Sequence, residues 1–133
     1  MPLQLEIVTP AARVLTTSCD EVRLPGSMGG FGVRPGHTPL VAQLDAGELL
    51  YLSGSELHRY AVGEGFSEVS SDRVRVLVEE AINADQLDPA TAQKELAERQ
   101  KLLGGLKTDD PGYELERAKV ERAAARAFVA GRK

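Results

Sequence analysis

Short apolar segments of period two, separated by frequent turn signals, most strongly constrain the fold of this chain. Apolar side chains occupy every second position of residues 3–7 and 73–78, as in strands with one buried face. Residues 49–52 and 57–62 flank a Ser-Gly-Ser turn as a predicted hairpin, and residues 66–69 are expected to pair with 73–78 across Ser-Ser-Asp. Many short strands separated in this way predict an antiparallel sandwich or barrel.

After residue 85 the strand alternation stops and helix signals begin. Asp88-Pro89 and Asp110-Pro111 each place a capping carboxylate before a proline at the first helical position. The first predicted helix runs over residues 89–103 and the second over 111–130, each ending at glycine. We therefore divide the chain into a sheet segment, residues 1–85, and a helical hairpin, residues 86–133.

The apolar stripes of the predicted helices are rich in alanine. They comprise Ala92, Leu96 and Leu103 on the first helix and, on the second, Tyr113, Val120, Ala124 and Phe128 beside Leu115, Ala118, Ala125 and Val129. Burial contributes about 25 cal/mol per Å² of apolar area, so small side chains stabilise little. We expect a weakly docked hairpin that can move.

Charge is distributed unevenly along the chain. Residues 1–85 contain six arginines and twelve acidic residues, whereas residues 86–133 contain ten basic and eight acidic residues. At about 100° per residue, Lys119, Arg122 and Arg126 share one side of the second helix. Such a cationic helix face favours docking on an acidic protein surface. The alternative is a solvated helix face whose side chains extend into water.

Residues 22–39 hold a concentration of glycine and proline that predicts a sharply turning loop presenting backbone groups. The loop carries no catalytic group. Ser67, Ser70 and Ser71 are interpreted as turn serines without a histidine at a recognisable motif spacing, and Cys19 is the single cysteine. No phosphate-binding glycine motif is present, and the acidic, aromatic-poor sheet segment argues against nucleic acid. We expect no catalytic site, cofactor, metal or nucleic-acid partner.

No apolar run approaches the length of a membrane span, and the first residues carry neither a signal nor a transit pattern. These features predict a cytoplasmic protein.

Four sequence blocks together resemble the epsilon subunit of F-type ATP synthases from residue 5 to the start of the first helix. The blocks are Val22-x-Leu24-Pro25-Gly26, Gly29-x-Phe31-Gly32-x-x-Pro35-Gly36-His37-x-Pro39-Leu40, Gly65-Phe66-x-Glu68-Val69 and Arg73-Val74-x-Val76-Leu77. The helical tail is similar in layout only. The resemblance implies a β-sandwich of about ten strands followed by an antiparallel two-helix hairpin.

The resemblance also implies a non-catalytic rotor subunit at the foot of the central stalk, on the cytoplasmic face of the membrane. The sandwich would bind the gamma subunit and rest on the ring of c subunits of a proton-translocating synthase. Its ring-facing loop would be Met28-Gly29-Gly30-Phe31, supported by Pro35-Gly36-His37. Because Gly30 stands where the family often has an acidic residue, backbone and shape contacts are expected there. His37 has an equal alternative as a turn residue bonded to nearby backbone.

In bacterial members of that family the hairpin can extend and block ATP hydrolysis. The resemblance then implies contacts from Lys119, Arg122 and Arg126 to the catalytic beta subunits, alongside alpha. Some members bind ATP through a motif at the start of the first helix. Thr91 replaces the arginine of that motif, so ATP binding is not expected, and Asp88 is explained as a helix cap.

A different class of function also fits the residue patterns. A free-standing β-sandwich adaptor or ligand-binding module could carry the same helical tail for docking. Recovery of the chain with gamma favours the stalk subunit, whereas a discrete small ligand favours the adaptor.

Overall fold

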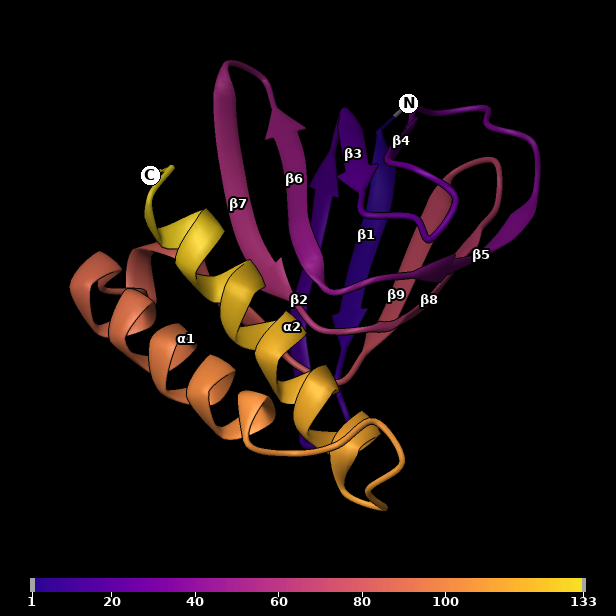
Figure 1. Cartoon of the computed structure of the whole chain (residues 1–133). Helices are drawn as coiled ribbons and strands as arrows, with labels where there is room; N and C mark the ends of the chain where they lie inside the picture. Colours follow the sequence, from indigo (N-terminus) through magenta and orange to yellow (C-terminus); the bar gives the residue numbers. More distant parts are fainter. Residues whose placement is uncertain (1, 133) are drawn as a thin grey trace.

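The computed structural model describes residues 2–132 and confirms the predicted fold class. Ten strands form two facing sheets, and two helices follow them and lie against one side of the sandwich (Figure 1). The predicted ends of the two segments, residues 1 and 133, lie outside the described range. No helix within that range is both long and apolar enough to cross a bilayer.

The strands are short, as the frequent turn signals predict. They are β1 (Leu3–Val8), β2 (Arg13–Cys19), β3 (Glu21–Leu24), β4 (Phe31–Val33), β5 (Leu40–Leu44), β6 (Gly47–Ser53), β7 (Glu56–Val62), β8 (Gly65–Val69), β9 (Arg73–Val78) and β10 (Ala81–Asn83). The first sheet has the order β2-β1-β9-β8-β5, and the second has the order β10-β7-β6-β3-β4. The predicted hairpins β6–β7 and β8–β9 are both present and antiparallel.

One pairing differs from a purely antiparallel sandwich. β1 pairs with β9 in parallel, with Leu5 opposite Val74 and Ile7 opposite Val76. Both strands turn alternate apolar residues inward, so this pairing places four buried side chains side by side. Strands from both sheets supply a single core, which includes Cys19. The parallel pairing therefore places the first strand of the sheet segment beside one of its last strands, in the interior of the first sheet.

Helix α1 (Pro89–Gly104) begins as predicted, with Asp88 as its cap, whereas α2 (Tyr113–Ala130) begins later than predicted. The second Asp-Pro pair forms a turn instead of a helix start. The Asp110 carboxylate accepts a hydrogen bond from the Gly112 amide at 2.8 Å, and the Asp110 carbonyl accepts one from Tyr113. Gly112 is the N-cap of α2, and no side-chain hydrogen bond caps the start of this helix. Asp110 thus stabilises the connector between the helices.

Helix α2 lies across β6 and β7, and α1 packs along α2 (Figure 1). The buried residues of α2 are Ala123, Ala125, Ala127, Val129 and Ala130. The prediction that Ala124 and Phe128 belong to a buried apolar stripe is wrong, because both side chains are exposed. Ala125 and Val129 are buried as expected, although Leu115 of the same stripe is exposed. The helix therefore meets the sandwich through small side chains.

Ser67 is also placed differently from its interpretation as a turn serine. It lies within β8, is fully buried, and its hydroxyl has no hydrogen-bond partner among the described residues. Its neighbours across the sheet are Ala42 and Val76. Ser67 is therefore a small core residue.

Gly65 is a position at which the sandwich cannot accept a side chain. An added Cβ would lie 2.8 Å from the Val78 Cα and would collide with the Leu77 carbonyl oxygen. We expect Gly65→Ala to lower the free energy of unfolding in urea by about 1–3 kcal/mol. Gly104→Ala is the control, because nothing lies within 4 Å of its added Cβ, and we expect it to change the value by at most about 1 kcal/mol. Equal effects of both substitutions would contradict this assignment.

Candidate functional site

The hairpin and the sandwich are joined by ion pairs that begin on α2. Arg122 donates from Nε to Oε1 of Glu64 and from Nη2 to Oε2, each over 2.8 Å. This two-point geometry matches the planar guanidinium to the carboxylate and fixes the orientation of both groups. The side chain of Arg122 is 21% exposed and that of Glu64 is 38% exposed. The pair is consequently shielded in part from solvent.

Arg126 makes a second connection one helical turn later. Its Nη1 donates to Oε2 of Glu80 over 2.6 Å, and its Nε lies 3.7 Å from a carboxylate oxygen of Glu95 on α1. Arg132, beyond the helix, approaches Glu48 of β6 at 3.3 Å. We call the pairs Arg122–Glu64 and Arg126–Glu80 the hairpin latch. Together they attach α2 to the turns after β7 and β9.

Lys119 belongs to the same predicted cationic face but is not part of the hairpin latch. Its ammonium group lies 4.0 Å from Glu116 on its own helix. The structure thus brings two of the three predicted inhibitory cations together with sandwich carboxylates and leaves the third on the helix surface.

The hairpin latch shifts the proton affinity of its members. The hydrogen bonds from Arg122 lower the pKa of Glu64 below its ordinary value of 4.5, against the opposing effect of burial. The hydrogen bond to Glu64 raises the pKa of Arg122, with smaller contributions from Glu79 and Glu80. Each partner therefore favours the charged form of the other.

The start of α1 has no arginine at the position where a nucleotide-binding motif would place one. The Asp88 carboxylate accepts hydrogen bonds from the amide of Thr91 at 2.9 Å and from its hydroxyl at 2.7 Å. This is the predicted capping role. Within residues 2–132 no three metal-ligating side chains gather as a metal site would require.

The loop after β3 is held rigidly and presents one apolar side chain. Ser27 donates from its amide to the Gln43 carbonyl and from its hydroxyl to Asp45. Met28 at the tip is fully exposed, and Gly29 has a φ of 118°, which favours glycine. Phe31 packs against the core. Among Met28–Phe31, therefore, Met28 is the large apolar side chain that is fully exposed, and Gly30 adds no charge.

Pro35-Gly36-His37 does not lie beside that loop. The turn follows the far end of β4, where the Gly36 amide donates to the Ser71 carbonyl of the β8–β9 turn. Nδ1 of His37 lies 2.6 Å from the Thr38 carbonyl oxygen, which is the local backbone contact considered as the alternative for this residue. The two halves of the predicted contact loop thus face different ends of the sandwich.

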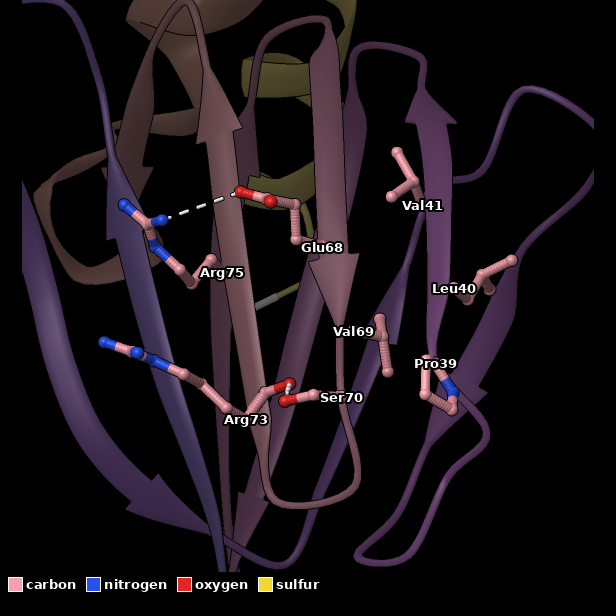
Figure 2. A pocket seen from close by; sticks show the side chains of 8 residues that line it. All are labelled: Pro39, Leu40, Val41, Glu68, Val69, Ser70, Arg73 and Arg75. Atoms are coloured by element: carbon pink, nitrogen blue, oxygen red, sulfur yellow. Dashed lines mark hydrogen bonds and ion pairs between the residues drawn. The ribbon is translucent and has the colours of Figure 1, made fainter.

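A shallow hollow of about 450 Å³ lies at the β5 edge of the first sheet (Figure 2). Its lining residues are Pro39, Leu40, Val41, Glu68, Val69, Ser70, Arg73 and Arg75. Val41 is 71% exposed, and β5 pairs only with β8 among the described strands. Arg75 forms ion pairs with Glu6 and Glu68. The hollow therefore combines exposed apolar side chains with an edge strand that is bridged by the loop after β3 only near Gln43 and Leu44, on the sheet opposite the hairpin.

Sequence patterns identified the arginines of the hairpin latch but missed its carboxylates. Glu64 lies between two glycines and Glu80 follows another glutamate, both in turns between strands. Acidic turn residues are common on solvated surfaces, so neither position carries a distinctive motif. The excess of acidic residues in the sheet segment was the available signal, and it does not indicate which ones face α2.

Comparison with known proteins gives concordant matches. Residues 2–84 match the family described as the ATP synthase delta/epsilon chain β-sandwich domain. The ATP synthase epsilon chain of Anaeromyxobacter dehalogenans strain 2CP-C is 48% identical over 99% of this chain and 100% of its own length. That of Myxococcus xanthus is 41% identical over 93% and 91% of the two chains. A chain in the cryo-EM structure of Euglena gracilis mitochondrial ATP synthase has a similar fold, with a TM-score of 0.78 at 19% identity, covering 99% and 82%.

The lowered pKa of Glu64 makes hairpin docking sensitive to acid. A carboxylate with a lowered pKa in the docked state stabilises that state above its ordinary pKa, and the contribution disappears as pH falls through the lowered value. We expect the protection factors of amides in α2 to decrease as pH falls below about 4.5, before those in β1 do. The dependence should be weaker in Glu64→Gln, measured by hydrogen exchange normalised to intrinsic rates. An identical pH response in this variant would contradict the assignment.

Proposed function

The chain belongs to the family of ATP synthase epsilon chains, and from this membership we propose that it is a non-catalytic rotor subunit of the central stalk. It couples rotation of the c ring to the catalytic head through gamma. The subunit is associated with the cytoplasmic face of the membrane only through the complex. The observation that carries the proposal is the near full-length similarity to named epsilon chains.

The sandwich offers separate surfaces for the two rotor contacts. The exposed Met28 loop contacts the c ring by shape and backbone groups, since Gly30 carries no charge. The β5 hollow and the adjoining Pro35–His37 turn contact gamma. Val41 and Leu40 supply apolar area there, and the exposed Phe66 extends it on β8. Both surfaces remain accessible with the hairpin docked. Helix α2 covers β6 and β7, whereas the β5 hollow lies on the other sheet and the Met28 loop follows β3, with Met28 fully exposed.

The hairpin restrains wasteful ATP hydrolysis by leaving the sandwich and inserting α2 beside the beta and alpha subunits. Lys119, Arg122 and Arg126 contact acidic groups there. Two features support this role. The docked helix buries mainly alanines, and its strongest visible attachments are partly exposed ion pairs. A bistable element of this kind needs two packings that differ by only a few kcal/mol.

Truncation tests the regulatory part of the proposal. Ending the chain after Leu103 removes α2 together with Lys119, Arg122 and Arg126, while every strand of the sandwich is retained. We expect the reconstituted synthase to hydrolyse ATP faster than the complex with the full chain and to remain assembled. Steady-state ATPase assays with subunit quantification check this. Unchanged hydrolysis in a complete complex would remove the inhibitory role.

Substitution in the β5 hollow tests the gamma contact. Val41→Glu adds a charge to a highly exposed apolar position, and we expect it to weaken binding to a gamma-containing complex at least about tenfold because a buried unpaired carboxylate is costly. Val14→Glu is the matched control, since Val14 is exposed on the opposite edge strand β2. Titration by biolayer interferometry gives both affinities. Equal affinities for the two variants would argue against this surface.

A further inference from the structure

The hairpin latch uses cations of the same helix face that the proposed inhibition requires. Arg122 and Arg126 are both mostly covered, with 21% and 18% of their side chains exposed. Their guanidinium groups are held in specific geometries by carboxylates of the sandwich turns, at 2.6 to 2.8 Å. In the docked state, neither arginine is available in this geometry to a second carboxylate surface.

We infer that Glu64 and Glu80 compete with the catalytic head for Arg122 and Arg126, so that hairpin release is an exchange of carboxylate partners. The inference rests on the proposed function, and it adds the sandwich residues that oppose inhibition. A guanidinium that leaves a carboxylate in a partly desolvated site needs an equivalent partner to recover the lost interaction. An acidic protein surface supplies such a partner, whereas an apolar or basic surface does not.

The acidic surroundings of the hairpin latch make simple release unfavourable. Glu79 and Glu80 lie at one turn and Glu64 at another, and all three lie close enough to influence the charge state of Arg122. Undocking would leave these carboxylates facing one another without the arginines, and like charges in proximity repel. It would also leave Arg122 and Arg126 without their carboxylate partners on the sandwich. The equilibrium is therefore biased toward the docked state until another acidic surface is present.

The same geometry separates two kinds of cation on α2. Among the ion pairs of residues 2–132, Lys119 takes part only in the one with Glu116 of its own helix, so it can reach a partner surface while α2 stays on the sandwich. Arg122 and Arg126 cannot reach a partner surface while they remain bound to the carboxylates of the sandwich. Substituting either arginine would weaken both states at once, whereas neutralising the sandwich carboxylates weakens only the docked state. The glutamates are consequently the informative positions.

The test is the double variant Glu64→Gln and Glu80→Gln in the full chain. In the isolated subunit, each lost ion pair should shift the ratio of docked to undocked hairpin about twofold to fivefold, seen as faster amide exchange in α2. In the reconstituted synthase, the same variant should hydrolyse ATP at least about threefold more slowly than the wild type. Truncation after Leu103 should abolish that difference. Glu56→Gln is the control for the loss of one carboxylate charge and is compared also with Glu64→Gln and Glu80→Gln made singly, because Glu56 is exposed and, among residues 2–132, forms an ion pair only with His58.

The outcomes separate the inference from the proposed function. Suppose that truncation still accelerates ATP hydrolysis by the wild-type complex. Unchanged amide hydrogen exchange in α2 of the double variant would then overturn the inference that the arginines change carboxylate partners. Faster hydrogen exchange without slower ATP hydrolysis would overturn it as well. In that case the inhibitory role stands without the hairpin latch. If truncation of the wild type changes nothing, the proposed function fails and the inference fails with it. A response of Glu56→Gln equal to that of the double variant would also overturn the inference, because it would reflect net charge alone.

Discussion

The contact between α2 and the sandwich is made of small side chains, and the placement of the charged groups depends on it. Alanine at positions 123 and 127 lets the helix approach the sheet closely, which brings Arg122 and Arg126 within hydrogen-bond distance of the turn glutamates. Larger side chains would bury more area but would hold the arginines farther away. A helix attached in this way is fixed mainly by geometry and charge, and these interactions depend on solvent conditions.

The sandwich and the hairpin thereby meet different physical requirements. The sandwich has a continuous apolar core in which strands from both ends of the segment pair, as β1 and β9 do. Such a core suits the part that, in the proposed function, contacts gamma and the c ring. A second, smaller cluster lies where the hairpin meets the sandwich, and it is built from alanines of both segments with Leu87 and Val129. The lower apolar content of the hairpin suits an element that changes position while the sandwich stays intact.

The sequence predicts the local parts of this structure more successfully than the distant ones. The hairpins β6–β7 and β8–β9 follow from alternation and turn signals a few residues apart. The parallel pairing of β1 with β9 joins residues such as Glu6 and Arg75, which are 69 positions apart, and no local pattern encodes it. Asp110-Pro111 has the composition of a helix start, but the Asp110 carboxylate bonds to Gly112 and closes a turn instead. The sequence does not identify the carboxylates of the hairpin latch, because only the docking of α2 distinguishes them from other acidic turn residues.

The central claim is that Arg122 and Glu64 hold the hairpin against the sandwich. A double-mutant cycle of Arg122→Gln and Glu64→Gln, with α2 hydrogen exchange in the full chain as the measure of docking, tests it most directly. The claim predicts that the two substitutions are not additive and that their coupling is at least about 0.5 kcal/mol. Additive effects, with coupling near zero, would contradict it and would assign hairpin docking to the alanine contact and the Arg126–Glu80 pair.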